Sequence, residues 1–158
     1  MDDISLARLL AIPGAFIMAG YSFSASQNFL PLLFNHQSSV STPIFTGVFR
    51  RGGTAMVPAS LLTTAAFAYL AYRRPEQRSL YGTAAALTLS FLPWTRIVMY
   101  PGIARLMEVA GASQAEMAKA DASGETLRLL KAWWGQNFVR AALAFGAGMV
   151  GMTAESRI

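Results

Sequence analysis

Apolar residues gather in four long runs along the chain, and polar stretches separate them. The runs cover about residues 5–33, 46–72, 80–100 and 132–153. Each is long enough to cross a bilayer as an α-helix, which needs roughly 20 residues. The pattern therefore predicts an all-α fold, an integral membrane antiparallel four-helix bundle that forms a single transmembrane domain over residues 1–158.

The connections between these runs differ in length. Asn35–Pro43 is predicted to be a loop, and it holds the single histidine, His36. The arginine-rich turn at 73–78 is short and favours cytosolic termini. The polar stretch 102–131 is the longest connection, and within it Ala104–Lys119 has the composition of a surface helix. Gly111 weakens that helix, and a break is expected beyond it at Gly124.

The fourth run is apolar but carries a polar face. Trp133, Asn137 and Arg140 follow one another at helical spacing, so they lie on one side of the helix. Arg140 is roughly 12 Å from the start of the run at about 1.5 Å per residue. An arginine at that depth normally faces a protein-lined or wet interior. The alternative is that Arg140 snorkels to the interface and that the tryptophans are only interfacial belt residues.

The end of the first run is also polar. Tyr21, Ser24 and Asn28 share one helical face, which predicts a polar stripe turned toward the interior of the bundle. Hydrogen bonding between helices is the alternative explanation for such residues. In the third run, Pro93 is predicted to kink the helix because it cannot continue the backbone hydrogen bonds.

In an antiparallel bundle these unusual positions meet at one membrane face. The residues brought together there include Ser24, Asn28, His36, Arg50, Trp94, Tyr100, Trp133, Asn137 and Arg140. The arrangement predicts a polar pocket with an aromatic rim that opens on one leaflet. Aromatic rings beside arginine suit a flat, electron-rich or anionic ring.

Composition narrows the chemistry. Hydrophobic residues make up 54% of the chain and charged ones 13%, against roughly 25% in soluble domains. The net charge of +5 arises from residues that flank the apolar runs, so no nucleic acid partner is expected. The chain has no cysteine and its runs contain no Asp or Glu, so no metal site is expected. Proton transfer and oxyanion stabilisation remain as catalytic tools.

Two segments resemble a known family. LYGTAAALTLSFLPWTRIVMYP (Leu80–Pro101) and LLKAWWGQNFVRAALAFGAGMVG (Leu129–Gly151) are similar to the third and fourth spans of the anthrone oxygenase-like family. The order of LYG, PWT and Trp-x-x-x-Asn-x-x-Arg carries the likeness, which extends to Phe49–Tyr72 and the first run. The chain departs from the family pattern after Pro101, where Gly-Ile-Ala follows, and at Arg96, where an apolar residue is usual.

The resemblance implies an oxygenase of secondary metabolism that converts an anthrone to an anthraquinone with dioxygen and no cofactor. Arg140, with Asn137 as a donor, would stabilise the oxyanion of the flat aromatic substrate, and Trp133 and Trp94 would stack on its ring. His36 would be the catalytic base, with Tyr21 or Tyr100 as alternatives.

Asn28, Ser24, Arg50 and Tyr100 complete the expected substrate contacts. The alternative function is a non-enzymatic four-helix membrane protein that binds a lipid, a quinone or a partner helix. Membrane lipids are expected partners in either case, and the sequence leaves open whether the chain forms a homo-oligomer.

Overall fold

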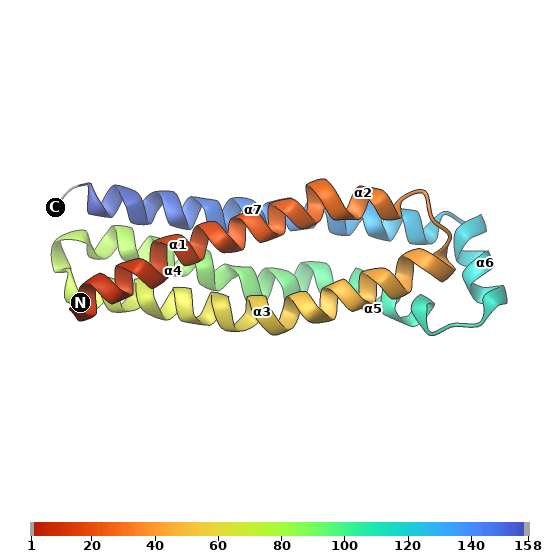
Figure 1. The fold of residues 1–158 in the computed structure, drawn as a ribbon, viewed down its shortest axis with the longest axis horizontal. Helices are drawn as coiled ribbons and strands as arrows, with labels where there is room; N and C mark the ends of the chain where they lie inside the picture. The colour runs from red at the N-terminus through yellow and green to blue at the C-terminus, as the bar shows by residue number, and fades with distance from the viewer. Residues whose placement is uncertain (1, 157–158) are drawn as a thin grey trace.

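Four helical rods lie side by side along most of the length of the molecule (Figure 1). A computed structural model describes residues 2–156, and within that range it contains helices, turns and no strand. The first rod is α1 (Asp3–Ser24), a π-helical turn (Ala25–Phe29) and α2 (Leu30–Leu33); the second is α3 (Ser38–Arg73). The third is α4 (Arg78–Pro93), a second π-helical turn (Trp94–Met99) and α5 (Tyr100–Ala110); the fourth is α7 (Glu125–Glu155). The all-α bundle predicted from the sequence is confirmed.

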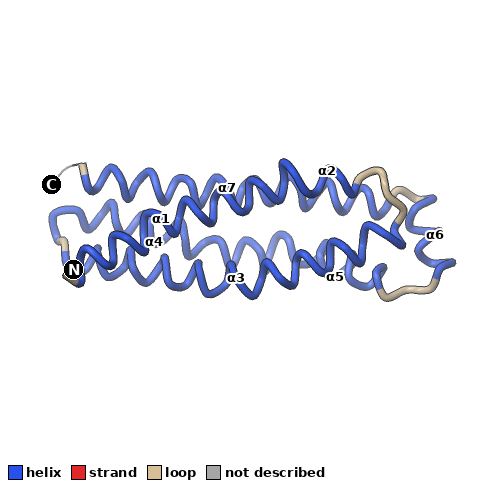
Figure 2. The backbone as a smooth tube through the Cα atoms, in the orientation of Figure 1, coloured by secondary structure: helices blue, strands red, loops and turns tan. Residues whose placement is uncertain are grey.

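The rods run antiparallel, and each contacts two neighbours. α1 packs against α3 and α7, and α4 packs against the same two helices. Both termini lie at one end of the bundle, where the 3₁₀ turn Pro75–Gln77 joins α3 to α4. The short helix α6 (Gln114–Ala122) closes the opposite end, and the loops are confined to the two ends (Figure 2).

Two helical stretches are long and apolar enough to cross a membrane. They are Asp3–Leu33, of 31 residues, and Ser38–Arg73, of 36 residues. At 1.5 Å per residue the longer one measures about 54 Å, whereas the hydrocarbon core of a bilayer is about 30 Å thick. The bundle is therefore longer than a membrane is thick, and part of it must project beyond the hydrocarbon of any bilayer that it crosses.

The connections are more helical than the sequence suggested. The loop predicted at Asn35–Pro43 is wrong beyond its first residues, because α3 begins at Ser38 and includes Pro43. The stretch 102–131 is also largely helical, since α5 continues the third rod to Ala110. The single helix expected over Ala104–Lys119 is divided at Gly111 into α5 and α6. The break expected at Gly124 is present, with the left-handed φ of 66° that favours glycine.

A contact from α6 explains why α3 begins so early. The backbone N–H and the hydroxyl of Ser38 donate to a carboxylate oxygen of Asp121, at 2.9 and 2.5 Å. The Ser38 hydroxyl also lies 2.6 Å from that of Thr126, on α7. Asp121 thus caps the N-terminus of α3 from another helix, and this long-range partner is not visible in the local sequence.

Close packing of α7 against its neighbours depends on two glycines. A Cβ added at Gly148 would lie 2.8 Å from the ring of Phe16, and one at Gly151 would lie 2.7 Å from the ring of Phe67. These glycines belong to the run Gly146–Gly151, which has the Gly-x-Gly-x-x-Gly spacing of dinucleotide-binding loops. Here the run lies inside a helix, so its glycines serve helix packing and do not form a phosphate loop.

The tight contact predicts unequal effects of two alanine substitutions on α7. Gly151→Ala should lower the free energy of unfolding by about 1–3 kcal/mol, because the buried Phe67 ring has no room to move away. Gly135→Ala should leave it unchanged or raise it by up to about 1 kcal/mol, because no atom lies within 4 Å of the added carbon. Thermal unfolding in detergent, followed by circular dichroism, measures both. Equal stability of the two variants would contradict the packing described.

Candidate functional site

Two π-helical turns interrupt the first and third rods. Each contains a backbone hydrogen bond to the carbonyl five residues earlier. The Leu30 N–H donates to the Ala25 carbonyl, and the Tyr100 N–H donates to the Thr95 carbonyl. A proline, Pro31 or Pro101, follows directly in both cases. A proline ring crowds the carbonyl four residues before it and offers that carbonyl no N–H, which widens the helical turn. Turns of this kind often occur at functional sites.

The buried polar residues of the first rod are not the ones expected from the sequence. Ser22 and Ser26 are fully buried, whereas Ser24 and Asn28 are exposed and hydrogen-bond to each other. The prediction that the stripe of Tyr21, Ser24 and Asn28 faces inward is therefore wrong for its last two members. The buried residues of this rod include Ala15, Ser22 and Leu30. Its interior face is therefore mainly apolar, with two serines.

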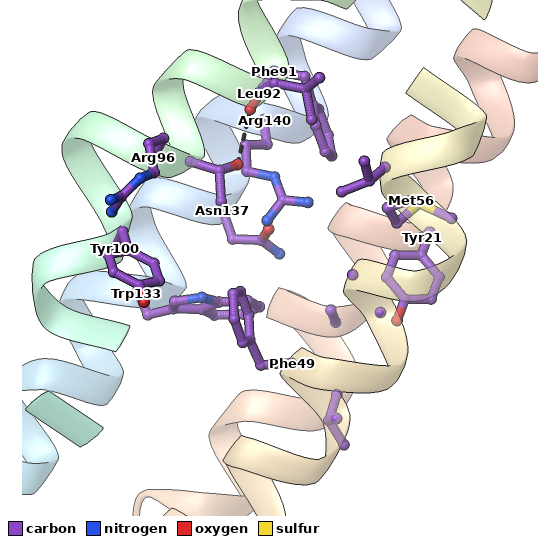
Figure 3. A pocket seen from close by; sticks show the side chains of 16 residues that line it. Tyr21, Phe49, Met56, Phe91, Leu92, Arg96, Tyr100, Trp133, Asn137 and Arg140 are labelled. Carbon is purple, nitrogen blue, oxygen red and sulfur yellow. Dashed lines mark hydrogen bonds between the residues drawn. The ribbon is translucent and has the colours of Figure 1, made fainter. Parts of the chain in front are cut away.

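A cavity of about 290 Å³ lies between the four rods at the level of these turns. Figure 3 shows it from close by, with side chains from all four rods pointing toward it. Its lining is formed by Tyr21, Ala25, Val48, Phe49, Gly52, Gly53, Met56, Val57, Phe91, Leu92, Thr95, Arg96, Tyr100, Trp133, Asn137 and Arg140. The volume is close to the lower limit for small-molecule sites, and most of the walls are apolar. No Asp or Glu is among the lining residues.

Arg140 places a guanidinium group in this cavity. The side chain is only 7% exposed, and its Cζ atom lies 3.9 Å from the centre of the Phe91 ring. Among residues 2–156, the Met99 sulfur, at 4.0 Å, is the hydrogen-bond partner of Nη1, and Nε has none. A buried cation without an acidic partner is costly unless an anion joins it. The cavity is therefore prepared for a negatively charged group.

Asn137 is held by two hydrogen bonds from its amide nitrogen. Nδ2 donates to the Ser22 carbonyl at 2.7 Å and to the Ser26 hydroxyl at 3.0 Å. A carbonyl can only accept, so this contact fixes which end of the amide is nitrogen. The amide oxygen accepts no hydrogen bond from residues 2–156, and Asn137 lines the cavity. The nitrogen of Asn137, which we expected to donate to an oxyanion, is thus engaged within the protein, and its oxygen is left as an acceptor.

Aromatic rings form the walls on either side of the arginine. Trp133 is 7% exposed and meets the Phe45 ring edge-on, with centroids 5.5 Å apart. Phe45 in turn stacks on Phe49, which lies beside Trp133 in Figure 3. Phe91 lies at the other end of the cavity in this view. Such walls accommodate a flat ring through stacking.

The mouth of the cavity lies between α3 and the third rod. Gly53 has open space where a side chain would be, since no atom lies within 4 Å of an added Cβ. Gly52 faces Tyr21, whose hydroxyl would be 2.7 Å from a Cβ at that position. Arg96 and Tyr100 are exposed on the third rod, and the Arg96 guanidinium lies over the Tyr100 ring at 4.3 Å.

Comparison with known proteins identifies the family. The anthrone oxygenase family profile matches residues 45–150, which include the arginine, the asparagine and most of the cavity lining. The chain belongs to the anthrone oxygenase family. It is 27% identical to the anthrone oxygenase encC of Aspergillus fumigatus, over 94% of this chain and 92% of the relative. It is 24% identical to an anthrone oxygenase of Claviceps purpurea, over 94% and 88% of the two chains. No solved structure matches the chain.

In this member of the anthrone oxygenase family, only some of the site residues expected from the sequence lie together around the cavity. Arg140, Asn137, Trp133 and Tyr100 line the cavity. His36 does not, because it lies exposed in the turn before α3 and borders a separate hollow beside α6.

Four other expected contacts also lie outside the cavity lining. Trp94 uses its indole N–H to bond the Gln136 carbonyl at 3.2 Å, so it joins the third rod to α7. Arg50, Ser24 and Asn28 are exposed on the outer surface of their rods. Each of the four belongs to a rod that lines the cavity, but helical rotation turns its side chain elsewhere.

Several residues that matter to the site were not expected from the sequence. Ser22 and Ser26 anchor Asn137, and Met56, Phe91 and Gly53 shape the cavity. Pro31 and Pro101 were the available signals, because each predicts an altered turn and hence a shifted interior face. The glycine pair at 52–53 was a second signal for a close approach between helices.

The anchoring of Asn137 predicts a loss of stability when its amide is removed. Asn137→Leu should lower the free energy of unfolding by about 1–3 kcal/mol, because the buried Ser22 carbonyl and Ser26 hydroxyl lose a shared donor. Gln136→Leu is the matched control, since its side chain makes no hydrogen bond within residues 2–156 and is only half-buried. Chemical denaturation in detergent measures the difference, and equal losses in both variants would contradict the assigned amide orientation.

Proposed function

We propose that this chain oxidises an anthrone-type aromatic compound to the corresponding anthraquinone with dioxygen, without a cofactor. The single observation that carries the proposal is the unpaired Arg140 guanidinium, buried in a cavity with aromatic walls. The membership of the family and the two relatives, both named anthrone oxygenases, support the reaction class.

The proposed setting is a bilayer crossed by all four rods. Tyr72 ends the charge-free part of α3, and Gly52 precedes it by 20 residues, or about 30 Å. A bilayer that begins at Tyr72 would therefore place Gly52, and with it the cavity mouth, near the opposite headgroups. A flat tricyclic substrate held in the membrane would meet the cavity at that level. The end closed by α6 would project into water.

The reaction begins with the loss of a proton from the methylene carbon of the central ring. The electrons of the broken C–H bond move onto the carbonyl oxygen on the opposite side of this ring. They give an aromatic oxyanion, which passes one electron to dioxygen. The resulting radical and superoxide combine at the same carbon and form a carbon–oxygen bond. Loss of the second proton with cleavage of the O–O bond gives the new carbonyl and one water. The atoms balance, since a CH₂ group and O₂ become C=O and H₂O.

The lining residues have distinct parts in this scheme. Arg140 stabilises the oxyanion, and its planar fork of N–H donors suits an aromatic oxygen. Asn137 accepts a hydrogen bond from a hydroxyl group of the substrate, because its oxygen is the end that faces the cavity. Trp133 provides a ring face along which the tricycle stacks. Water is largely excluded by the apolar walls, which strengthens the attraction between Arg140 and the oxyanion.

The proton path runs through tyrosine in this proposal. Among the ionisable lining residues, Tyr21 and Tyr100 are the two that are not arginines. Tyr21 is closely held, since its hydroxyl occupies the space that the absent side chain of Gly52 leaves. A hydroxyl accepts and donates at the same time, so Tyr21 relays the proton to water at the mouth. His36 has no place in this path because it borders another hollow.

Oxygen uptake tests the proposed function directly. The detergent-purified protein, treated with a chelator and free of flavin, should consume oxygen above the spontaneous rate with emodin anthrone and form emodin. Arg140→Leu should reduce this rate by roughly 10²–10³-fold, and Arg140→Lys by less, because lysine keeps the charge but loses the fork. Restoration of activity only on metal or flavin addition would contradict the cofactor-independent scheme. A folded wild type that binds the anthrone without uptake would instead favour the non-enzymatic binding protein.

Filling the cavity provides an independent test. Gly53→Leu should abolish turnover with little loss of stability, because the new side chain enters open space in the cavity. Gly47→Leu is the matched control on the same helix, since Gly47 is exposed, has no atom within 4 Å of an added Cβ and lies outside the lining. The rate of emodin formation and the unfolding temperature are compared for both variants. Full activity of a stable Gly53→Leu protein would place the reaction elsewhere.

A further inference from the structure

Arg96 is a second arginine at the cavity, and the reaction scheme does not use it. It lies at the mouth, on the π-helical turn of the third rod. Within residues 2–156 no carboxylate approaches it within salt-bridge distance. Arg8, Arg73 and Arg105 have acidic partners, but Arg50, Arg51, Arg74, Arg78 and Arg128 have none within the described residues either, so what distinguishes Arg96 is its place at the cavity. The two arginines of the cavity are thus unpaired, and none of the lining residues is acidic.

The contact with Tyr100 holds the Arg96 guanidinium in place. Its Cζ atom lies 4.3 Å from the centre of the tyrosine ring. Stacking on a ring uses the face of a guanidinium and leaves the N–H groups at its edge free for an anion. Tyr100 itself lines the cavity, and Figure 3 shows the Arg96 side chain next to its ring.

This pair belongs to the face of the third rod that lines the cavity. Leu92, Arg96 and Tyr100 all line it at spacings of four residues, which are wider than the 3.6-residue repeat of an α-helix. Met99, at the end of the same turn, is 1% exposed and packs in the core. The third rod therefore presents Arg96 and Tyr100 at the cavity on one face while it buries Met99 and Ile103 on another.

We propose that Arg96 binds a second acidic oxygen group of the substrate, a carboxylate or an ionised phenol, at the edge of the ring that lies nearest the mouth. The substrate is then an aromatic acid with two anionic oxygens when it reacts. One is the ring oxyanion on Arg140, and the other is the acidic group on Arg96. The inference rests on the proposed function only in taking the cavity as the substrate site.

Binding of two non-reacting ligands tests this assignment without turnover. Anthraquinone-2-carboxylate and its neutral carboxamide have the same ring and nearly the same shape. Their affinities are measured by quenching of tryptophan fluorescence, with the protein in phosphatidylcholine nanodiscs. The wild type should bind the carboxylate about tenfold more tightly than the carboxamide. Arg96→Leu should reduce this preference to within about twofold, and Arg96→Lys should keep part of it.

Arg51→Leu is the matched control, because Arg51 is an exposed arginine of α3 outside the cavity lining. It should keep the full carboxylate preference. An equal preference in the wild type and in Arg96→Leu would overturn the proposal. The measurement is repeated with phosphatidylglycerol in the nanodiscs. If Arg96→Leu changes only the response to that lipid, Arg96 binds a lipid headgroup and the proposal is also overturned.

The outcome is separable from that of the oxygen assay. A carboxylate preference that depends on Arg96, in a protein that consumes no oxygen, would support the inference and reject the oxygenase. Turnover of emodin anthrone together with no preference for the carboxylate would reject the inference alone.

Discussion

The burial of an unpaired positive charge is the constraint on which the site depends. Arg140 is enclosed by an aromatic ring, a methionine sulfur and apolar walls, and within residues 2–156 no carboxylate compensates it. Keeping an ion in such surroundings costs several kcal/mol, which the rest of the bundle must offset. The small residues of α7, which allow close contact with α1 and α3, are one source of that stability. An anion bound beside Arg140 would offset part of this cost, and its affinity for the site would be higher for that reason.

The prolines give this bundle its cavity. In a regular four-helix bundle with short inward side chains, the helices pack together without a cavity. The half nearest the termini is packed in this way around Ala7, Ala11 and Ala147. At Pro31 and Pro101 the helices cannot continue their regular bonding, and each widens into a π-helical turn. The two turns lie in different rods but line the same cavity through Ala25, Thr95 and Arg96. Local disruption of two helices is therefore what separates the pocket from the packed core.

Polar groups in this protein are used either for anchoring or for the ligand. The amide nitrogen of Asn137 donates to the Ser22 carbonyl and to the Ser26 hydroxyl, and these bonds fix α7 against the first rod. This leaves the amide oxygen, the guanidinium of Arg140 and the tyrosine hydroxyls for the cavity. At the end closed by α6, Asp121 has a purely structural part, because its carboxylate caps α3. The division explains why a chain with few polar residues can still build a specific site.

The sequence by itself determined the number of long helices, their antiparallel order and the end of the bundle where the unusual residues gather. These follow from local properties, namely the lengths of apolar runs and of their connections. It also indicated Arg140, Asn137 and Trp133 as one face, because i, i+4 and i+7 positions must coincide on a helix. Only the tertiary structure decided that Ser24, Asn28 and Arg50 face outward, that Asn137 offers its oxygen and that α3 begins at Ser38. The rotation of each rod about its own axis, the partners of the Asn137 amide and the cap that Asp121 gives to α3 all depend on segments distant in the sequence. They cannot be read from the spacing of residues along one helix.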